Sequence, residues 1–317
     1  MFNFKDMTMK QINRPRTHAC VLFDDTFKVV IFSPRNRDFL IQLIELMLPG
    51  KKIRDIAFLS SENHGLVVSD KNINFDMFCT EKDTGEQFLV EMQFSGEDSY
   101  QDRMLSYSTY PIRVQLTEKL EAIERGEKID KMDYSLRPLY VISILNFKID
   151  HTGDEALEDG FISRYSIRND ANGELMTDAL HFVYFELGRL KARFGEENKC
   201  VTVLEQVAYS LKYGHMLKER PENFRDEILK LLYRAINLAN LTQKELENYD
   251  KIMTTKLDII AQINYAERKA REEGAAEGET RGKAEVARNM LAKGIAADVV
   301  SECTGLSVEE AQALAEK

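Results

Sequence analysis

The chain has 317 residues, of which 44% are hydrophobic and 30% charged, and its formal net charge is −10. This length supports a substantial buried core and favours two domains over one. No segment is long and apolar enough to span a membrane, and the N-terminus lacks the pattern of a secretory signal. The four cysteines form no C-x-x-C pair, which argues against a zinc site or a disulfide framework and favours a reduced, cytoplasmic setting. The acidity argues against binding nucleic acid by charge alone, since phosphate contacts need Lys and Arg, although a local basic groove can coexist with an acidic remainder.

The N-terminal part of the chain predicts two short helices and a strand. Residues 1–20 are expected to form a weakly structured arm. A helical pattern begins at Asp24-Asp25 and ends at Pro49-Gly50, and Ser33-Pro34 is expected to interrupt it. Residues 53–59 are then expected to form a first strand.

Residues 70–94 carry the most informative pattern of the sequence. Two stretches of period-2 alternation flank Asp83-Thr84-Gly85, which is a good hairpin turn. A turn centred there places Asp76 opposite Glu91, with Gln93 on the same face of its strand, and cross-strand neighbours lie within about 5 Å. We expect this face to point toward the surface. Two carboxylates and an amide on a rigid hairpin could bind one divalent cation, which points to metal-dependent phosphodiester cleavage.

The middle of the chain alternates between helix and strand. Residues 98–125 predict a helix that Pro111 should bend or break. The apolar run 139–147 is typical of a strand buried on both faces. Residues 161–167 and 180–187 predict two further strands joined by a turn.

From about residue 200 onward the pattern is helical. Residues 201–217 and 221–239 are amphipathic, and a long charged helix is expected from Gln243. Glycines recur in it every four residues, as in a soft solvated helix or, alternatively, a face that another helix can approach closely. Residues 286–317 suggest three short helices broken at two glycines, like a small helix-turn-helix unit. This tail holds more acidic than basic side chains, which favours protein contact over operator reading.

Four motifs follow one another along the chain: Asp24-Asp25-Thr26-Phe27-Lys28, Asp76, Glu91-Met92-Gln93 and Arg103-Met104-Leu105-Ser106-Tyr107. In this order they resemble the Rpn family of recombination-promoting nucleases, also labelled transposases, of the PD-(D/E)xK nuclease superfamily. The resemblance covers about residues 20–190, and the C-terminal segment 305–314 also looks like the tails of such proteins.

The resemblance implies a restriction-endonuclease-like α/β core, a mixed central sheet flanked by helices, followed by an all-helical C-terminal region. Together with this resemblance, the sequence pattern predicts four parts of the chain. They are an arm (1–20), a nuclease-like domain (21–195), a helical domain (196–265) and a charged helix with a helix-turn-helix-like tail (266–317). It also implies Mg²⁺-dependent (or Mn²⁺-dependent) DNA endonuclease activity.

The resemblance implies that Asp76 and Glu91 correspond to the metal-binding carboxylates of the family. The Met92 carbonyl is a further candidate ligand. Gln93 stands where the wider superfamily has lysine. Glutamine can orient water but supplies no positive charge to the transition state. A second metal, Lys28 or Lys71 could compensate, and the sequence does not decide between them.

Several residues have a structural alternative to their functional role. The family motif favours Asp24 as an extra acidic group, with Asp25 as the fallback, yet either could be a helix N-cap. Arg103 could contact a phosphate, form a structural salt bridge or cover the core with its aliphatic stem. Tyr100 and Tyr107 share its helix face and fit packing better than base stacking. The five histidines show no metal-like spacing and are expected to be structural or at the surface.

Two functions follow from these patterns. The leading hypothesis is a metal-dependent DNA endonuclease, assembled as a homo-oligomer, expected to be a dimer, through its C-terminal helices. The alternative is a nuclease fold that is catalytically silent and serves as an interaction module. No sequence feature favours strand joining, the reaction of a true transposase, over cleavage.

Overall fold

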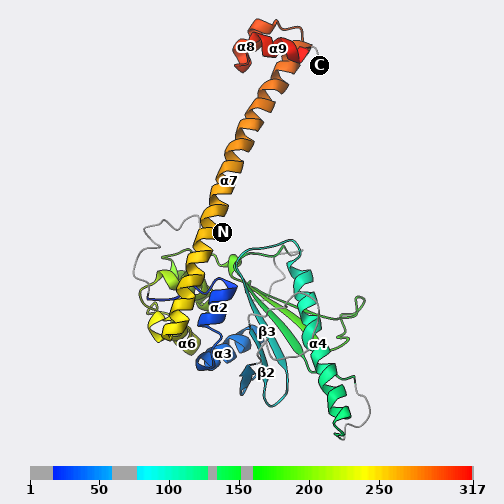
Figure 1. The fold of residues 1–317 in the computed structure, drawn as a ribbon, viewed down its shortest axis with the longest axis vertical. Helices are drawn as coiled ribbons and strands as arrows, with labels where there is room; N and C mark the ends of the chain where they lie inside the picture. Colours follow the sequence, from blue (N-terminus) through cyan, green and yellow to red (C-terminus); the bar gives the residue numbers. More distant parts are fainter. Residues whose placement is uncertain (1–16, 59–76, 128–133, 151–159, 316–317) are drawn as a thin grey trace. The chain divides into compact units, whose positions relative to one another are not determined.

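The structure is a computed structural model that describes residues 17–58, 77–127, 134–150 and 160–315. The chain divides into two compact units, Met1–Met253 and Thr254–Lys317, and each is described by itself. Figure 1 labels the main elements along the chain. The predicted domain boundaries near residues 20, 195 and 265 stay predictions.

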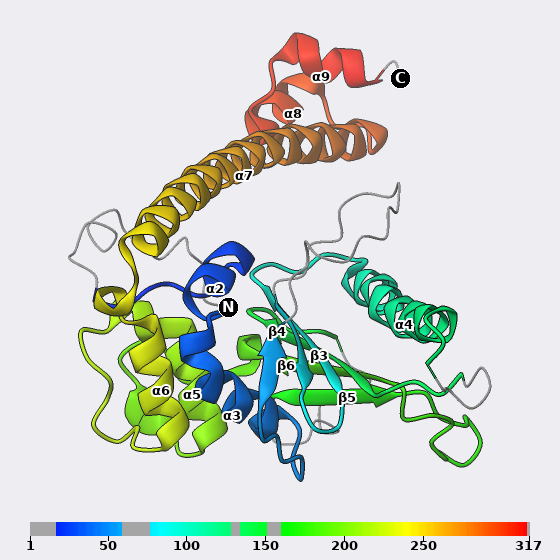
Figure 2. The ribbon, with the colours of Figure 1, turned by 60° about the horizontal axis from the view of Figure 1, so that its bottom comes forward.

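The core of the first unit is a six-stranded mixed sheet with the order β1-β2-β3-β4-β6-β5 (Figures 1 and 2). Strand β2 is antiparallel to β1 and β3, while β3, β4 and β6 run parallel and β5 is antiparallel at the edge. This arrangement confirms the expected α/β fold with a mixed central sheet. The strands are Ile56–Phe58 (β1), Met77–Glu81 (β2), Gln87–Gln93 (β3), Leu139–Leu145 (β4), Ile162–Ser166 (β5) and Leu180–Glu186 (β6).

The hairpin of β2 and β3 turns where the sequence predicts. The Glu81 carboxylate accepts hydrogen bonds from the backbone N–H groups of Asp83 (2.7 Å) and Thr84 (2.5 Å), which stabilises the turn. Gly85 has a φ of +74°, a conformation that favours glycine. Met77 pairs with Val90, as the predicted register requires.

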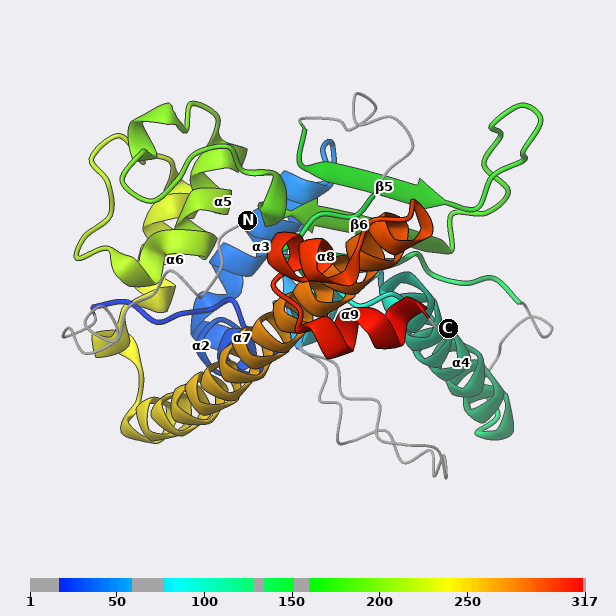
Figure 3. The same cartoon turned by 90° about the horizontal axis from the view of Figure 1, so that it is seen from above.

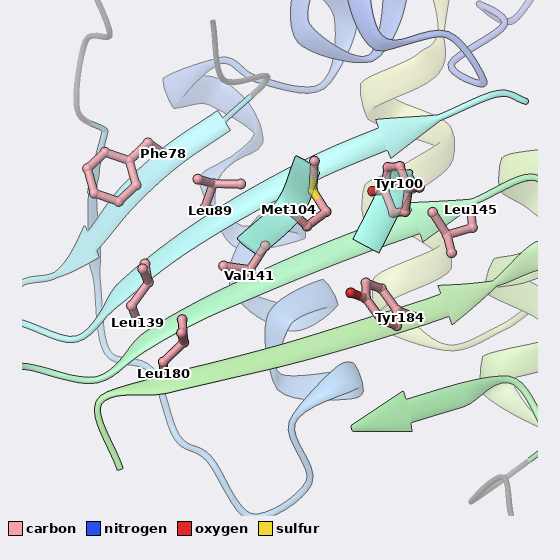
Figure 4. Packing of buried hydrophobic residues seen from close by; sticks show 9 residues of the cluster. All are labelled: Phe78, Leu89, Tyr100, Met104, Leu139, Val141, Leu145, Leu180 and Tyr184. Carbon is pink, nitrogen blue, oxygen red and sulfur yellow. The ribbon is translucent and has the colours of Figure 1, made fainter. Parts of the chain in front are cut away.

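One long helix, α4 (Tyr100–Glu124), covers one face of the sheet. It packs against β4 and contributes Tyr100 and Met104 to a buried apolar cluster (Figure 4). Because this cluster spans β2, β3, β4 and β6, the hairpin is buried on the face that α4 covers. Its other members are Phe78, Leu89, Leu139, Val141, Leu145, Leu180 and Tyr184.

Helix α4 corrects one prediction. The sequence predicts that Pro111 bends or breaks this helix; Pro111 lies inside a helix that continues from Tyr100 to Glu124, so the break does not occur and a bend stays a prediction. Pro111 is buried, and its ring therefore packs within the structure although the residue has no N–H to donate to the turn before it. Tertiary packing overrides the local preference here.

Helices α2 (Asp24–Val30) and α3 (Arg37–Met47) lie on the side of the sheet away from α4 (Figure 1). A short 3-10 helix, Pro34–Asn36, separates them at the predicted interruption. The Arg164 guanidinium of β5 donates from Nε (3.1 Å) and Nη2 (3.0 Å) to the Met47 carbonyl. This contact anchors the end of α3 to the sheet, because it satisfies a carbonyl that lacks a partner within the helix.

Helices α5 (Val203–Tyr213) and α6 (Glu227–Ile236) pack side by side (Figures 2 and 3) and belong to the same compact unit as the sheet. Both are shorter than the predicted segments. Residues 17–20, predicted as part of a loose arm, are bound to this region: the Ala19 N–H donates to the Ile236 carbonyl (2.7 Å). Short 3-10 helices connect the elements at Leu187–Arg189, Glu197–Lys199, Gly214–Met216 and Leu238–Asn240.

Helix α7 (Gln243–Ala292) begins in the first unit, where its Tyr249 hydroxyl accepts a hydrogen bond from the Cys20 N–H (2.9 Å). The second unit contains its remainder together with α8 (Ala297–Thr304) and α9 (Val308–Ala315). Ala287, Val300 and Ala311 form the small core of this unit. The expected long helix is confirmed, as are the interruptions near Gly294 and Gly305. Two short helices follow it in place of the predicted three, because the first predicted one is the last part of α7.

Candidate functional site

The central residue of the candidate site is Glu91, on strand β3. In the register of the parallel strands it pairs with Ser143 of β4, which in turn pairs with Tyr184 of β6. Glu91 is only 8% exposed. The prediction that this side of the hairpin points toward the surface is therefore wrong for Glu91, because α4 covers the face on which it lies. A buried carboxylate costs free energy unless polar groups or a cation compensate it.

Two buried hydroxyl groups accompany this carboxylate. Tyr100 Oη and Ser143 Oγ are buried, and neither makes a hydrogen bond of good geometry within the described residues. Burial raises the pKa of Tyr100 well above its usual value, and the negative charge of Glu91 raises it further, while the nearby Ser143 hydroxyl offsets part of the rise. Glu91, Tyr100 and Ser143 therefore form a buried polar cluster within an otherwise apolar core. Tyr100 and Tyr184 lie on this side of the sheet in Figure 4.

The Gln93 side chain lies two residues further along β3, at the end of the strand. Its Oε1 accepts a hydrogen bond from Arg103 Nη2 (2.8 Å), and its Nε2 donates to the Ser95 carbonyl (3.0 Å). Both ends of the amide are therefore fixed. Since a guanidinium can only donate and a carbonyl oxygen can only accept, these partners also define which end of the amide is oxygen.

Arg103 is held by more than Gln93. Its Nε lies 3.2 Å from Glu97 Oε1 in an ion pair. Its guanidinium carbon lies 5.1 Å from the ring centroid of Tyr100 and 5.9 Å from that of Tyr107. Arg103 thus forms the salt bridge that the sequence left as one alternative, and the two tyrosines pack against it as expected. Phosphate contact by Arg103 stays a prediction.

The first turn of α2 lies beside the end of β3. Helix α2 contacts β3, and the rings of Phe23 and Phe94 are 4.6 Å apart between centroids. The N-cap of α2 is Phe23, without a side-chain cap among the described residues, so neither Asp24 nor Asp25 is the N-cap. Asp24 is half-buried and Asp25 is exposed, and Lys28 lies in the last turn of α2.

Two residues of the predicted site, Asp76 and Lys71, lie outside the described residues, so their placement stays a prediction. Met92 is buried within β3, where it pairs with Ile144. Within the ranges that the structure describes, no three His, Cys, Asp or Glu side chains are grouped so that they could hold a metal ion.

Three histidines in the described part of the chain have structural surroundings. His18 Nδ1 lies 2.9 Å from the Leu217 carbonyl. The His181 ring stacks on Tyr140 at 4.7 Å, and His215 is buried. These three agree with the expected structural role.

Sequence reasoning missed Ser143 and Glu186. Ser143 is the only polar residue in the run LYVISIL, and this interruption of a buried strand was the signal available. Glu186 is fully buried at the end of β6 and pairs with Arg189 (Nε–Oε2 2.8 Å). It also accepts the Ile149 N–H (2.8 Å), which ties the ends of neighbouring strands together. Its position near the end of the predicted strand 180–187 gave no sign of burial.

Two family models match the sequence of this chain. A sequence model of the family described as PD-(D/E)XK nuclease family transposase matches residues 21–266. A second, described as Rpn/YhgA-like nuclease family, C-terminal HTH domain, matches residues 281–316. No curated protein and no solved structure matches the chain at a significant level. Among the described helices, none has the length and apolarity needed to cross a membrane. The chain belongs to the PD-(D/E)XK nuclease family transposases and carries at its C-terminus a helix-turn-helix domain of the Rpn/YhgA-like nucleases.

Proposed function

We propose that the protein is a metal-dependent DNA endonuclease that hydrolyses phosphodiester bonds. One observation supports this most: Glu91 is a buried carboxylate on a central strand, and two residues away Gln93 has both ends of its amide hydrogen-bonded. Burial of a charge costs free energy unless polar groups or a cation compensate it, and a bound divalent cation would compensate the charge of Glu91. Recombination, mobile-element biology and defence are the settings in which such an activity would serve.

The residues present fit a divalent cation. Nucleases of this superfamily generally use divalent metals, and hard cations such as Mg²⁺ or Mn²⁺ prefer oxygen ligands. Asp76 and Glu91, with the Met92 carbonyl, would hold the ion, and its charge would compensate the buried Glu91 carboxylate. When bound, it lowers the pKa of water and stabilises negative charge at phosphorus.

The side chains around this position have separate roles. We assign Gln93 to orienting the attacking water through the N–H and the lone pair that its two hydrogen bonds leave available. Asp24, in the first turn of α2 beside the end of β3, is the extra acidic residue, and Asp25 is its exposed neighbour. Lys28 and Lys71 are assigned to the DNA backbone, where a positive charge binds phosphate.

The C-terminal half is proposed to assemble the protein. Helix α7 is polar nearly all round along its central part, and such a helix is usually solvated or paired with another chain. We assign it to a homodimer. Although helix-turn-helix domains are typical of DNA binding, the matched residues 281–316 contain six acidic side chains and four Lys or Arg. We therefore assign the tail to protein contact.

The alternative function is a catalytically silent interaction module, which the overall acidity and the long charged helix favour. Nicking of supercoiled plasmid with Mg²⁺, with Mn²⁺ and with EDTA separates the two. The proposal expects metal-dependent nicking by the wild type and its loss in Glu91→Gln. Asp83→Asn is the matched control, since it removes an exposed carboxylate from the opposite end of the same hairpin. A wild type that is inactive with both metals, or a Glu91→Gln protein as active as the control, would overturn the proposal.

A further inference from the structure

We infer that Arg103 is a positioning residue for Gln93 and supplies, through it, the positive charge that a lysine at position 93 would carry. The inference rests on the proposed nuclease function. It concerns the single departure of this chain from the superfamily pattern, a neutral amide in place of an ammonium group.

The first argument is orientation. Gln93 Oε1 accepts from Arg103 Nη2 at 2.8 Å, and Nε2 donates to the Ser95 carbonyl at 3.0 Å. A glutamine amide has two N–H donors and two lone pairs on its oxygen, so one of each stays available. Without the guanidinium, the amide could rotate about its last torsion, which is broad and roughly two-fold. Arg103 therefore sets the direction in which Gln93 can act on a water molecule.

The second argument is charge. The side chain of an arginine carries a delocalised positive charge. Its hydrogen bond to Oε1 polarises the amide, so the remaining N–H becomes a stronger donor. Glu97 is an ion-pair partner of Arg103 at 3.2 Å, but its side chain is 37% exposed. Solvent therefore screens the interaction of Arg103 with Glu97 more than its interaction with Gln93, which is partly buried.

The third argument is the spacing of residues on α4. Tyr100 and Tyr107 lie three residues before and four residues after Arg103, so all three share one helix face. Their rings lie 5.1 and 5.9 Å from the guanidinium carbon. The Arg103 N–H donates to the Ser99 carbonyl (2.9 Å) in the first turn, just after the end of β3. The aromatic contacts hold the cation in place, and the short connection brings it to Gln93.

A double-mutant cycle at positions 93 and 103 tests this inference. Plasmid nicking is measured for the wild type, Arg103→Met, Gln93→Lys and the double variant. We expect Arg103→Met to lower kcat by about 10²–10³-fold, the range for losing one positioned polar group, with KM changed by less than about threefold. Gln93→Lys should lower wild-type activity, because it places an ammonium beside the guanidinium. In the Arg103→Met background the same lysine should raise kcat at least about tenfold.

The decisive outcome is that Gln93→Lys lowers activity in the wild type and raises it in Arg103→Met. If Gln93→Lys does not raise the activity of Arg103→Met, Arg103 does not supply the missing charge. If Arg103→Met instead raises KM and lowers the salt dependence of metal-free DNA binding by about one phosphate contact, Arg103 binds the DNA backbone directly and the inference is wrong.

A measurement without metal or DNA tests the orientation. With ¹⁵N-glutamine labelling, the side-chain amide signals of Gln93, identified by their loss in Gln93→Ala, should shift in Arg103→Met and stay near their original positions in Arg103→Lys. An unchanged signal in Arg103→Met would overturn the positioning role. This spectrum keeps its meaning even if the wild type proves inactive with every metal, so failure of the inference and failure of the proposed function are distinguishable.

Discussion

Glu91 of β3 and Ser143 of β4 occupy paired positions on neighbouring parallel strands, and both side chains are buried beneath α4. The Tyr100 hydroxyl of α4 is buried in the same region. An acidic group and two hydroxyls thus interrupt the apolar packing between helix and sheet. Packing alone does not call for the two hydroxyls, because buried hydroxyls without good hydrogen bonds, such as those of Tyr100 and Ser143, reduce the free energy of unfolding.

The first prediction follows from the Tyr100 hydroxyl. Tyr100→Phe should raise the free energy of unfolding of the metal-free protein by about 1 kcal/mol, since it removes a buried hydroxyl without a good hydrogen bond. Tyr209→Phe is the control, because the Tyr209 hydroxyl accepts from the Gly195 N–H and donates to Glu197. It should lower the free energy of unfolding by about 1 kcal/mol. Urea denaturation measures both, and equal changes in the two variants would contradict the prediction.

The second prediction concerns the metal-binding carboxylates. Asp76→Ala and Glu91→Gln should each lower nicking by more than about 10²-fold while the fold is retained. Because Mg²⁺ that binds the folded protein stabilises it, Mg²⁺ should raise the melting temperature of the wild type. It should not raise the melting temperature of either variant. Calorimetric scans with Mg²⁺ and with EDTA give this readout. Equal stabilisation of the wild type and both variants would show that the metal binds elsewhere.

Local signals predicted much of the first unit. The turn at Gly85 and the alternation after it were sufficient to predict the register that pairs Met77 with Val90. The burial of Glu91 was not predictable, because the pattern FLVEMQF fits a strand with one solvated face and only the packing of α4 buries that face. The contact between Arg103 and Gln93 was missed although both residues were candidates, since a side-chain hydrogen bond depends on how the helix is placed against the strand. The position of Asp76 stays a prediction.

The third prediction uses Lys212, which is buried in α5 and donates to the Leu187 carbonyl (3.3 Å). Burial, with a contribution from the charge of Lys148, lowers its pKa to about 8. Between pH 8 and about 10.5 the unfolded chain therefore binds more protons than the folded one, and stability rises with pH through this window. Lys212→Met should then stabilise the protein by about 1–2 kcal/mol at pH 7, and the gain should vanish as the pH approaches 10.5.

Urea unfolding at pH 7, 8, 9 and 10 measures the difference between Lys212→Met and the wild type. Lys218→Met serves as the control, since Lys218 is exposed and is not among the charges that lower the pKa of Lys212. A pH-independent difference for Lys212→Met would mean that Lys212 is not held with a lowered pKa.

The last prediction separates cleavage from assembly. A truncation near Leu190 would remove α5 and α6, which belong to the compact unit of the sheet and bind residues 17–20 through the Ala19–Ile236 hydrogen bond. A protein that ends at Met253 keeps these contacts and the hydrogen bond between Cys20 and Tyr249. We expect light scattering to show a dimer for the full chain and a monomer for residues 1–253. The shorter protein should still nick one strand, while cutting of both strands should fall, because two antiparallel strands need two active sites. A monomeric full chain, or a shorter protein that stays dimeric, would contradict assembly through the C-terminal helices.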